Sequence, residues 1–171
     1  LTQKKNLRLI ETGDFVKDES NNELRSVAGG LLVQSKEYPE LKYKDLKVVS
    51  DKKINEKDFD DISFSYKVNR YVKSNAIVIV KDKVMVGVGT GQTSRVKAVQ
   101  LAVEKAGKKS KGAVLCSDAF FPFRDGIDEA AKGGIGTIVH PGGSIRDQEV
   151  IDAANEHKMV MVFTGIRLFR H

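Results

Sequence analysis

The chain is poor in the features that hold small secreted and membrane proteins together. It has one cysteine, no tryptophan, three prolines and no apolar run longer than five residues. Cys116 alone forms no internal disulfide and indicates a reducing compartment, so a cytoplasmic location is expected. A membrane-spanning helix needs about 20 apolar residues, so none is predicted. The length of 171 residues and the 40% apolar content are typical of a globular domain.

Residues for metal or nucleophilic chemistry are also scarce. His140, His157 and His171 are far apart in the sequence, and with a single cysteine they do not form a zinc ligand set. No serine stands in the pattern of a nucleophile elbow, so a Ser-His-Asp triad is not supported. We therefore expect no bound metal.

The glycine-rich stretch "GVGTGQTSR" (87–95) is not a nucleotide fingerprint. Gln92 and Ser94 stand where the third glycine of a dinucleotide motif would be, and the Gly-Lys of a P-loop is absent. The stretch predicts a tight turn leading into a helix that is capped by Thr93 or Ser94.

The net charge of +6 and a pI of about 9.3 point to an anionic partner. Lysines such as Lys108 and Lys109 flank turns, however, which is typical of a solvated face. The tyrosines do not alternate with arginines in a strand pattern that would stack bases. We expect the anion to be a phosphate on a small molecule, with no nucleic acid and no membrane as partner.

Hydrophobic patterning predicts the elements of the first half. Residues 6–11 and 24–34 read as strands, and 46–50 is a short extended segment. The Gly29–Gly30 pair in the second strand would fit a bulge or a close approach of another backbone. A helix is expected from Phe59 through Val72, with Asp58 as its cap. Residues 74–80 and 84–89 predict a hairpin, and a helix follows that ends at Gly107.

The second half alternates strand and helix. Strands are predicted at 112–117, 135–140 and 159–163, with helices that begin near Asp125 and Ser144. Short loops between such elements imply right-handed crossovers and a parallel sheet. Together with the hairpin, this predicts an α/β fold with a mixed sheet and a parallel β-α-β-α-β half.

Three loops would open at the carboxyl ends of the parallel strands, where α/β sheets bind ligands. They are 117–125, 140–144 and 164–171. Asp125 and Ser144 each open a helix there, either as simple caps or beside N–H groups that hold an anion. Arg167 is either solvated or clamps a phosphate.

The loop "SDAFFPFRD" (117–125) holds three phenylalanines within four positions. Alternate residues of an extended segment face opposite sides. Phe121 and Phe123 can therefore enter the core while Phe120 faces the loops, or the reverse. At least two of the three are expected in the core.

Two long stretches carry a resemblance to a known family: "VKSNAIVIVKDKVMVGVGTGQTSRVKAVQLA" and "SDAFFPFRDGIDEAAKGGIGTIVHPGGSIRDQEVIDAANE". They resemble the C-terminal part of the bifunctional purine-biosynthesis enzymes that join AICAR formyltransferase to IMP cyclohydrolase. The resemblance implies that residues 1–171 are the second of two cytidine-deaminase-like units of the transformylase domain, without the deaminase zinc and with helices on both faces of the sheet. The first unit and the cyclohydrolase domain would be absent, as a chain starting at Leu1 also suggests.

The resemblance also implies the site. The enzyme moves a formyl group from 10-formyltetrahydrofolate to the 5-amino group of AICAR, and it works as a homodimer. The implied nucleotide contacts are Asn75, Arg95, Phe120 and Arg167. The implied folate contacts are Val96, Asp125, Ser144 and Ile145.

The family's catalytic Lys-His pair lies upstream, and no Lys-His dipeptide occurs in this chain. The resemblance leaves only a supporting role in catalysis, for Asn75, so the chain alone is expected to be inactive. Two other readings stay open: a non-catalytic basic module that binds a nucleotide or RNA, and a half-domain that serves mainly for dimerisation.

Overall fold

The computed structural model describes residues 6–14, 22–35 and 39–170. The chain divides into two units, Leu1–Glu40 and Leu41–His171, which are considered separately. The second unit contains all the residues of the expected site.

In the first unit, the structure corrects two predictions. Residues 24–34 are not one bulged strand but a hairpin of β1 (Asn22–Val27) and β2 (Gly30–Ser35), in which Val27 pairs with Gly30. The chain reverses because Gly29 takes a φ of 84°, which glycine adopts without strain. The predicted strand at 6–11 is wrong: residues 7–13 have no regular structure, since the described part of the chain offers them no strand to pair with.

The second unit is built on a six-stranded sheet with the order β3-β8-β7-β6-β4-β5. Its strands are β3 (Lys47–Val48), β4 (Ile77–Lys81), β5 (Val84–Gly89), β6 (Val114–Ser117), β7 (Thr137–His140) and β8 (Val160–Phe163). β6, β7 and β8 are parallel, whereas β4 runs antiparallel to β5 and β6, and β3 antiparallel to β8. The predicted mixed sheet with a parallel C-terminal half is confirmed.

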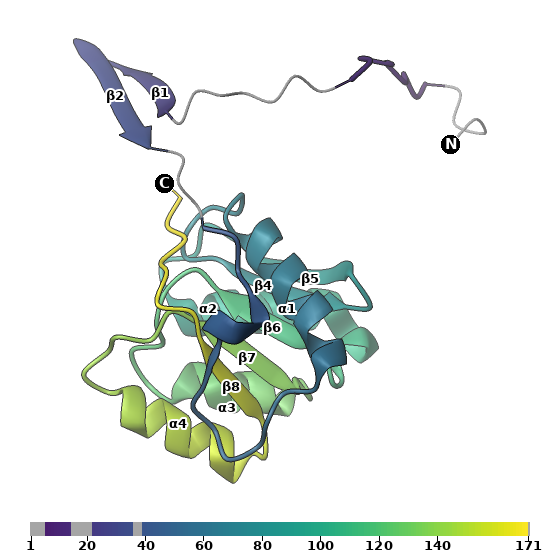
Figure 1. Cartoon of the computed structure of the whole chain (residues 1–171), viewed down its shortest axis with the longest axis vertical. Coiled ribbons are helices and arrows are strands. Elements are labelled where there is room, and N and C mark those ends of the chain that lie inside the picture. The colour runs from purple at the N-terminus through teal and green to yellow at the C-terminus, as the bar shows by residue number, and fades with distance from the viewer. Residues whose placement is uncertain (1–5, 15–21, 36–38, 171) are drawn as a thin grey trace. The chain divides into compact units, whose positions relative to one another are not determined.

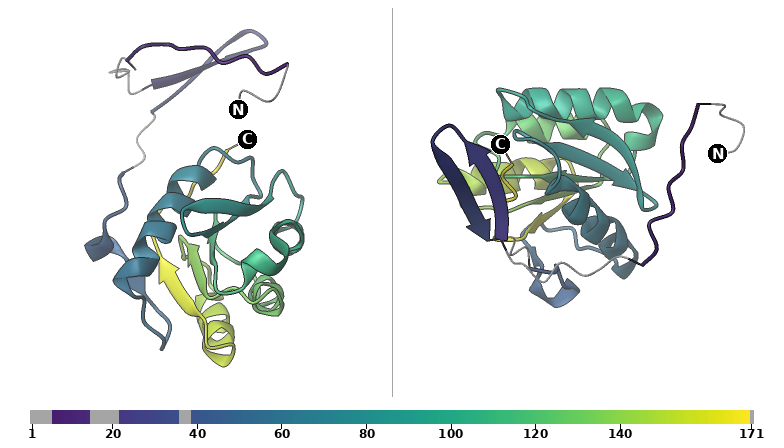
Figure 2. Two further views of the ribbon diagram at one scale, coloured as in Figure 1. Left: turned by 90° about the vertical axis from the view of Figure 1, so that its right-hand side faces the viewer. Right: turned by 90° about the horizontal axis from the view of Figure 1, so that it is seen from above.

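Helices cover both faces of this sheet (Figures 1 and 2). They are α1 (Glu56–Asn69), α2 (Arg95–Ala106), α3 (Asp125–Lys132) and α4 (Asp147–Glu156), with short 3-10 turns η1 (Tyr43–Asp45) and η2 (Gly107–Ser110). α1 packs on β4 and β6, while α2 packs on β4 and β5, and α4 packs on β8 and α3. One buried apolar cluster joins α2, α3 and α4 to the sheet, and it includes none of the α1 side chains that the structure describes.

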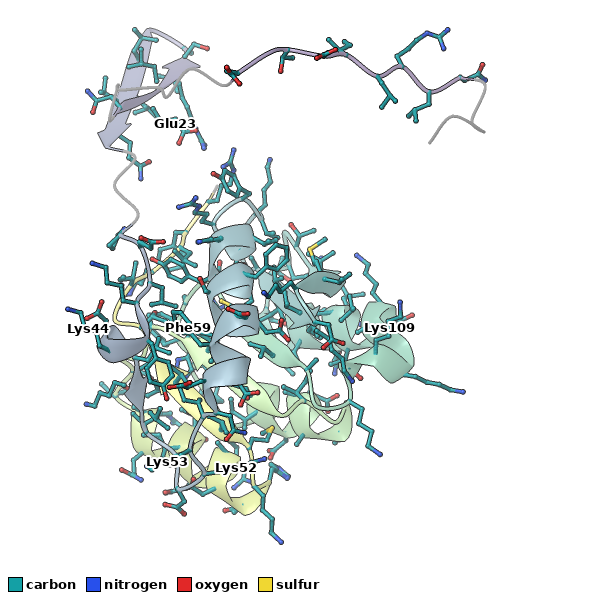
Figure 3. The ribbon with its side chains drawn as sticks, turned by 45° about the vertical axis from the view of Figure 1, so that its right-hand side comes forward. Glu23, Lys44, Lys52, Lys53, Phe59 and Lys109 are labelled. Carbon is teal, nitrogen blue, oxygen red and sulfur yellow. The ribbon has the colours of Figure 1, made fainter. Side chains whose placement is uncertain are left out.

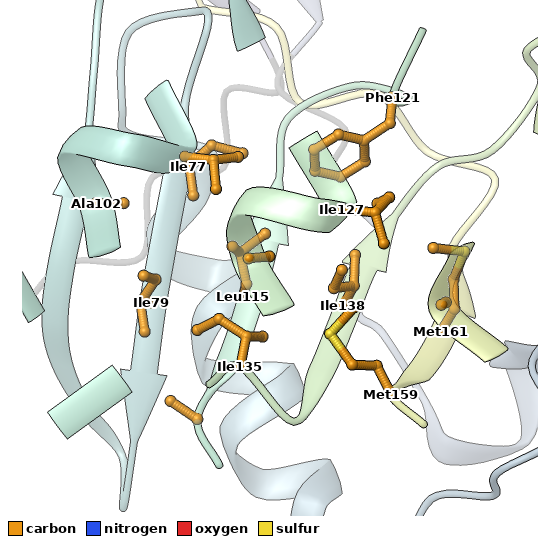
Figure 4. Close-up of a cluster of buried hydrophobic side chains, with 14 of the residues drawn as sticks. Ile77, Ile79, Ala102, Leu115, Phe121, Ile127, Ile135, Ile138, Met159 and Met161 are labelled. Carbon is orange, nitrogen blue, oxygen red and sulfur yellow. The ribbon is translucent and has the colours of Figure 1, made fainter. Parts of the chain in front are cut away.

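The strands are apolar on both faces because each face is covered. Ile77, Ile79, Leu115, Ile138 and Met161 belong to the cluster under α2, α3 and α4 (Figure 4). The residues between them in the strands point to the other face, as the two-residue period of a strand requires, and they are buried as well. Charged side chains such as Lys52, Lys53 and Lys109 lie exposed on the surface (Figure 3).

Two helix starts differ from their predictions. α1 begins three residues before Phe59, with Asn55 as its N-cap, and Asp58 completes the capping box by accepting a 3.1 Å hydrogen bond from the Asn55 N–H. α4 begins at Asp147 and not at Ser144. The predicted cap of α2 is confirmed, because Ser94 accepts a hydrogen bond from the Lys97 N–H.

We predict that Gly89→Ala lowers the free energy of unfolding. A Cβ at Gly89 would lie 2.0 Å from the Ala98 carbonyl oxygen, so α2 would have to move off β5. The expected loss is about 1–3 kcal/mol, measured by urea denaturation of the second unit's transition. The control is Gly30→Ala in β2, where an added Cβ meets no heavy atom within 4 Å. Equal stability of Gly89→Ala and wild type would contradict the close packing of α2 on β5.

Candidate functional site

The topology brings several loops to one edge of the sheet. Ser117, His140 and Phe163 end the parallel strands β6, β7 and β8, so they lie at the same edge. Ile77 pairs with both Ser117 and Gly89, so the start of β4 and the end of β5 reach this edge too. We call this edge the rim; it comprises 74–76, 90–95, 117–125, 140–146 and 164–170.

The rim holds a cavity of ≈ 460 Å³. It lies between the first turns of α2 and α3 and residues 117–125, which we call the phenylalanine loop. Its lining residues are Asn75, Thr93, Ser94, Arg95, Val96, Ala119, Phe120, Pro122, Phe123, Asp125 and Phe169. Five of the eight residues implied by the resemblance are among them: Asn75, Arg95, Val96, Phe120 and Asp125.

A buried ion pair forms one wall of the cavity. Nη1 of Arg95 donates to Oδ1 of Asp118 at 2.5 Å and to Oγ of Ser117 at 2.6 Å. The Asp118 side chain is fully buried and that of Arg95 is 8% exposed. Nη2 of Arg95 also donates to Oδ1 of Asn75 at 2.9 Å. Three of the five guanidinium N–H groups are therefore used within the described residues, and two stay available to a ligand.

The Asn75 amide is held in one orientation. Its oxygen accepts from Arg95, and its Nδ2 donates to the Gln92 carbonyl at 2.7 Å. The Ser74–Asn75 peptide bond is cis. Asn75 lines the cavity, and these two bonds leave one N–H and one oxygen lone pair of its amide unused, so it can both donate to and accept from a ligand.

The phenylalanine loop departs from the prediction. Only Phe121 is buried, at 0% exposure, whereas Phe120 is half-buried, Phe123 is 47% exposed, and both line the cavity. The expected strict alternation fails because the chain bends around Pro122 and leaves the extended conformation. Phe121 packs directly over Gly126 of α3, where a Cβ would lie 2.6 Å from the ring.

Two arginines stack on the two phenylalanines that line the cavity. The guanidinium of Arg167 lies 5.5 Å from the centroid of Phe120, and that of Arg146 lies 4.8 Å from Phe123. Arg167 does not line the cavity but is exposed beside it. The rim therefore offers flat apolar rings flanked by cations, which suits a planar anionic ligand.

The structure does not bring Ser144 and Ile145 into the cavity. Ile145 is fully exposed, and Ser144 accepts a hydrogen bond from the Arg146 N–H. The Asp147 carboxylate accepts from the N–H groups of Gly143 and Ser144 at 2.7 and 3.1 Å. These bonds shape a turn before α4, so Ser144 stands in a loop and does not open the helix.

Two buried residues, His140 in the rim and Cys116 next to it, are not suited to acid-base or nucleophilic chemistry. Burial lowers the pKa of His140 to about 3, and its Nδ1 accepts a hydrogen bond from the Gly142 N–H. Its ring packs against Phe121 and Phe163. Burial also raises the pKa of Cys116 to about 12, so the thiol stays protonated at neutral pH.

Among residues 6–14, 22–35 and 39–170, no three His, Cys, Asp or Glu side chains are grouped as a metal site would require. None of the helices that the structure describes combines the length and the apolar character needed to cross a membrane.

A charged network fastens the phenylalanine loop to α3 and α4. Arg124 donates to both carboxylate oxygens of Asp128, at 3.0 and 3.1 Å, and to Glu156 at 2.7 Å. Its backbone N–H donates to Glu149, and His157 lies 2.7 Å from Asp128. The hydrogen bonds from Arg124 hold the pKa of Asp128 below its usual value.

The fold and the site together define a class: an α/β protein with an open ligand cavity at the carboxyl edge of its parallel strands. The particular family follows from comparison with known proteins. A model of the AICARFT/IMPCHase bienzyme family matches residues 1–105. The bifunctional purine biosynthesis protein PurH of Persephonella marina is 51% identical over 99% of this chain, and that of Acetivibrio thermocellus is 49% identical over 100%.

This chain belongs to the AICARFT/IMPCHase bienzyme family. It spans about a third of the length of these relatives, 33% and 34% respectively.

Among solved structures, two forms of Acinetobacter baumannii RibD are similar. Form 1 has a TM-score of 0.46 and 15% identity, and it covers 63% of this chain and 35% of its own. Form 2 has a TM-score of 0.42 and 16% identity, and the match covers 60% of this chain and 34% of the RibD chain. Scores below 0.5 do not identify a common fold, so the fold assignment stands on the strand order and helix placement described above.

We predict that Asp128→Asn lowers the melting temperature by about 2 °C at pH 7. The pKa of Asp128 is lower in the folded protein than in the unfolded chain, so its charge stabilises the fold at neutral pH. This contribution is lost as the pH falls below the usual value of 3.8 and through the folded-state pKa, so the two melting curves should converge in acid.

The matched control is Asp152→Asn, which removes the same charge from α4 without touching Arg124. A melting-temperature difference for Asp128→Asn that persists unchanged at low pH would contradict an electrostatic role for this network.

Proposed function

We propose that the chain is the C-terminal portion of an AICAR formyltransferase domain, the second of its deaminase-like units, in a bifunctional enzyme of purine biosynthesis. Family membership supports the assignment, and so does the name of the PurH relatives. The observation that carries the proposal is the cavity: five residues assigned to the two substrates line one space, and they come from the segment before β4, the first turn of α2, the loop after β6 and the start of α3.

The nucleotide, AICAR, would be held by Asn75, Arg95, Phe120 and Arg167. Two N–H groups of Arg95 and the amide of Asn75 are available to the carboxamide and to phosphate oxygens. The Phe120 ring offers a face for the planar imidazole. Arg167 is exposed over the same ring, so it can swing onto a phosphate and bind it with two parallel hydrogen bonds.

The co-substrate, 10-formyltetrahydrofolate, would lie against Val96 and Asp125. A pterin is flat, with N–H donors along one edge. The exposed Phe123 ring suits its face, and the Asp125 carboxylate can accept from that edge. Ser144 and Ile145 stand outside the cavity, next to the Arg146 that covers Phe123, where the longer end of the folate would reach them.

The reaction forms a bond between the 5-amino nitrogen of AICAR and the formyl carbon, and it breaks the bond from that carbon to N10 of the folate. The amine loses a proton, and N10 gains one. Because the amine is delocalised into its ring, it is a weak nucleophile, and catalysis depends on orientation, oxyanion stabilisation and proton transfer. Asn75 is placed to support the oxyanion. A proton-transfer pair must come from outside this chain.

The chain would therefore act only with the rest of the enzyme, as a homodimer in the cytoplasm. Its length, about a third of that of its relatives, agrees with a partial site. The isolated chain should bind the substrates weakly and turn none over.

A second candidate is a basic module that binds a nucleotide or RNA without catalysis. It is favoured by another cavity, of ≈ 350 Å³, that Lys81, Lys108 and Lys109 line with Asp82. Binding there would depend steeply on salt, because each lysine–phosphate contact releases a counterion. Binding in the rim cavity, which rests on stacking and buried hydrogen bonds, should change far less with salt.

We predict that Asp125→Ala and Arg167→Ala separate the two ligands. Asp125→Ala should weaken a folate analogue about tenfold and leave AICAR nearly unchanged, whereas Arg167→Ala should do the reverse. Calorimetric titration of both ligands measures this, with Lys109→Ala, in the lysine-lined cavity, as the control. If either change weakens both ligands equally, the assignment of roles is wrong.

A further inference from the structure

Asp118 joins three segments of the rim at one buried point. Its backbone N–H donates to the Ala76 carbonyl at 3.2 Å, just before β4. Its carbonyl accepts from the Leu168 N–H at 2.8 Å, which anchors the segment that carries Arg167. Its carboxylate holds Arg95 at the start of α2. Asp118 thus links all three of these segments through hydrogen bonds.

The carboxylate decides how the Arg95 guanidinium is turned. Oδ1 of Asp118 and Oγ of Ser117 take both N–H groups of Nη1, so this end of the guanidinium is fixed toward the sheet. The Nε–H and one N–H of Nη2 are left on the other side, and Arg95 lines the cavity. The guanidinium is planar, so fixing one end fixes the edge that a ligand meets.

The orientation passes on to Asn75. Its amide oxygen faces Arg95 because a guanidinium only donates, and its Nδ2 therefore faces the Gln92 carbonyl. If Arg95 turned away, the amide oxygen would lose its donor, and the Gln92 carbonyl alone would hold the amide.

The second carboxylate oxygen of Asp118, Oδ2, is buried and has no hydrogen-bond partner among the described residues. Within the part of the chain that the structure describes, Arg95 is the only cation that forms an ion pair with Asp118. A buried charge is retained where its partner compensates it, and Arg95 is the cation that compensates Asp118.

We propose that Asp118 is a positioning residue for nucleotide binding: it touches no ligand, but it orients Arg95 and, through Arg95, Asn75. This inference rests on the proposed function, because it assumes that Arg95 binds the nucleotide.

The test compares AICAR with 5-formyltetrahydrofolate in NMR titrations of the 171-residue chain. Asp118→Asn keeps the size of the side chain and both backbone hydrogen bonds but removes the charge. The dissociation constant of AICAR should rise about tenfold, because a hydrogen-bonded ion pair orients its partner far more strongly than a neutral amide. That of the folate should change less than about twofold. An equal loss of both ligands would indicate a merely structural role and overturn the inference.

A double-mutant cycle adds a second readout. If Asp118 acts through Arg95, then Asp118→Asn should have no further effect on AICAR affinity once Arg95→Ala is present. Additive losses would show that Asp118 acts by another route and would overturn the inference.

Failure of the inference and failure of the proposed function look different. Wild type that binds no AICAR contradicts the proposed function. Wild type that binds AICAR while Asp118→Asn binds it equally well contradicts only the positioning role.

If Asp118→Asn does not fold, Ser117→Ala replaces it, since it removes one of the two acceptors of Nη1 and keeps the ion pair. AICAR should then bind about threefold more weakly, with folate unchanged. Unchanged AICAR binding in this variant would count against the proposal.

Discussion

The buried pair of Arg95 and Asp118 is the interaction on which the rim depends. It joins the first residue of α2 to the residue that follows β6. The Asp118 carbonyl also accepts a hydrogen bond from the Leu168 N–H. Two charges out of water are stable together only with good geometry, and removing one partner of such a pair costs about 3–5 kcal/mol. The rim therefore depends on an interaction that tolerates little change. Because Arg95 lines the cavity, the pair also fixes the position of that lining residue. A binding edge that is set before the ligand arrives loses little entropy on binding.

The rest of the site follows from short parallel strands. β6, β7 and β8 have four residues each and run parallel, so two crossovers place the loops that follow all three strands at one edge of a small unit. Phe121 is buried in the core over Gly126, whereas the rings of Phe120 and Phe123 line the cavity. The same loop thus serves the core with one phenylalanine and the ligand cavity with two.

The sequence predicted the order of elements in the C-terminal half well, because short, buried apolar strands alternate there with helices. The pairing of strands and the burial of single side chains were harder to predict. The hairpin of β1 and β2 depends on a left-handed Gly29, which reads equally well as a bulge, and residues 6–11 look like a strand but find no partner in the described chain. Phe123 was misplaced because Pro122 breaks the alternation. Asp118 was overlooked as part of the site, although an acidic residue directly after a buried apolar strand is a signal that it has a buried cationic partner.

A crystal structure of the chain with AICAR tests the central claim most directly. The account predicts the nucleotide in the rim cavity, with the imidazole on Phe120, the free edge of Arg95 within about 3 Å of a ligand oxygen, and the bond from Arg95 to Asp118 intact. AICAR bound instead among Lys81, Lys108 and Lys109, or an Arg95 turned away from Asp118 in the complex, would contradict it.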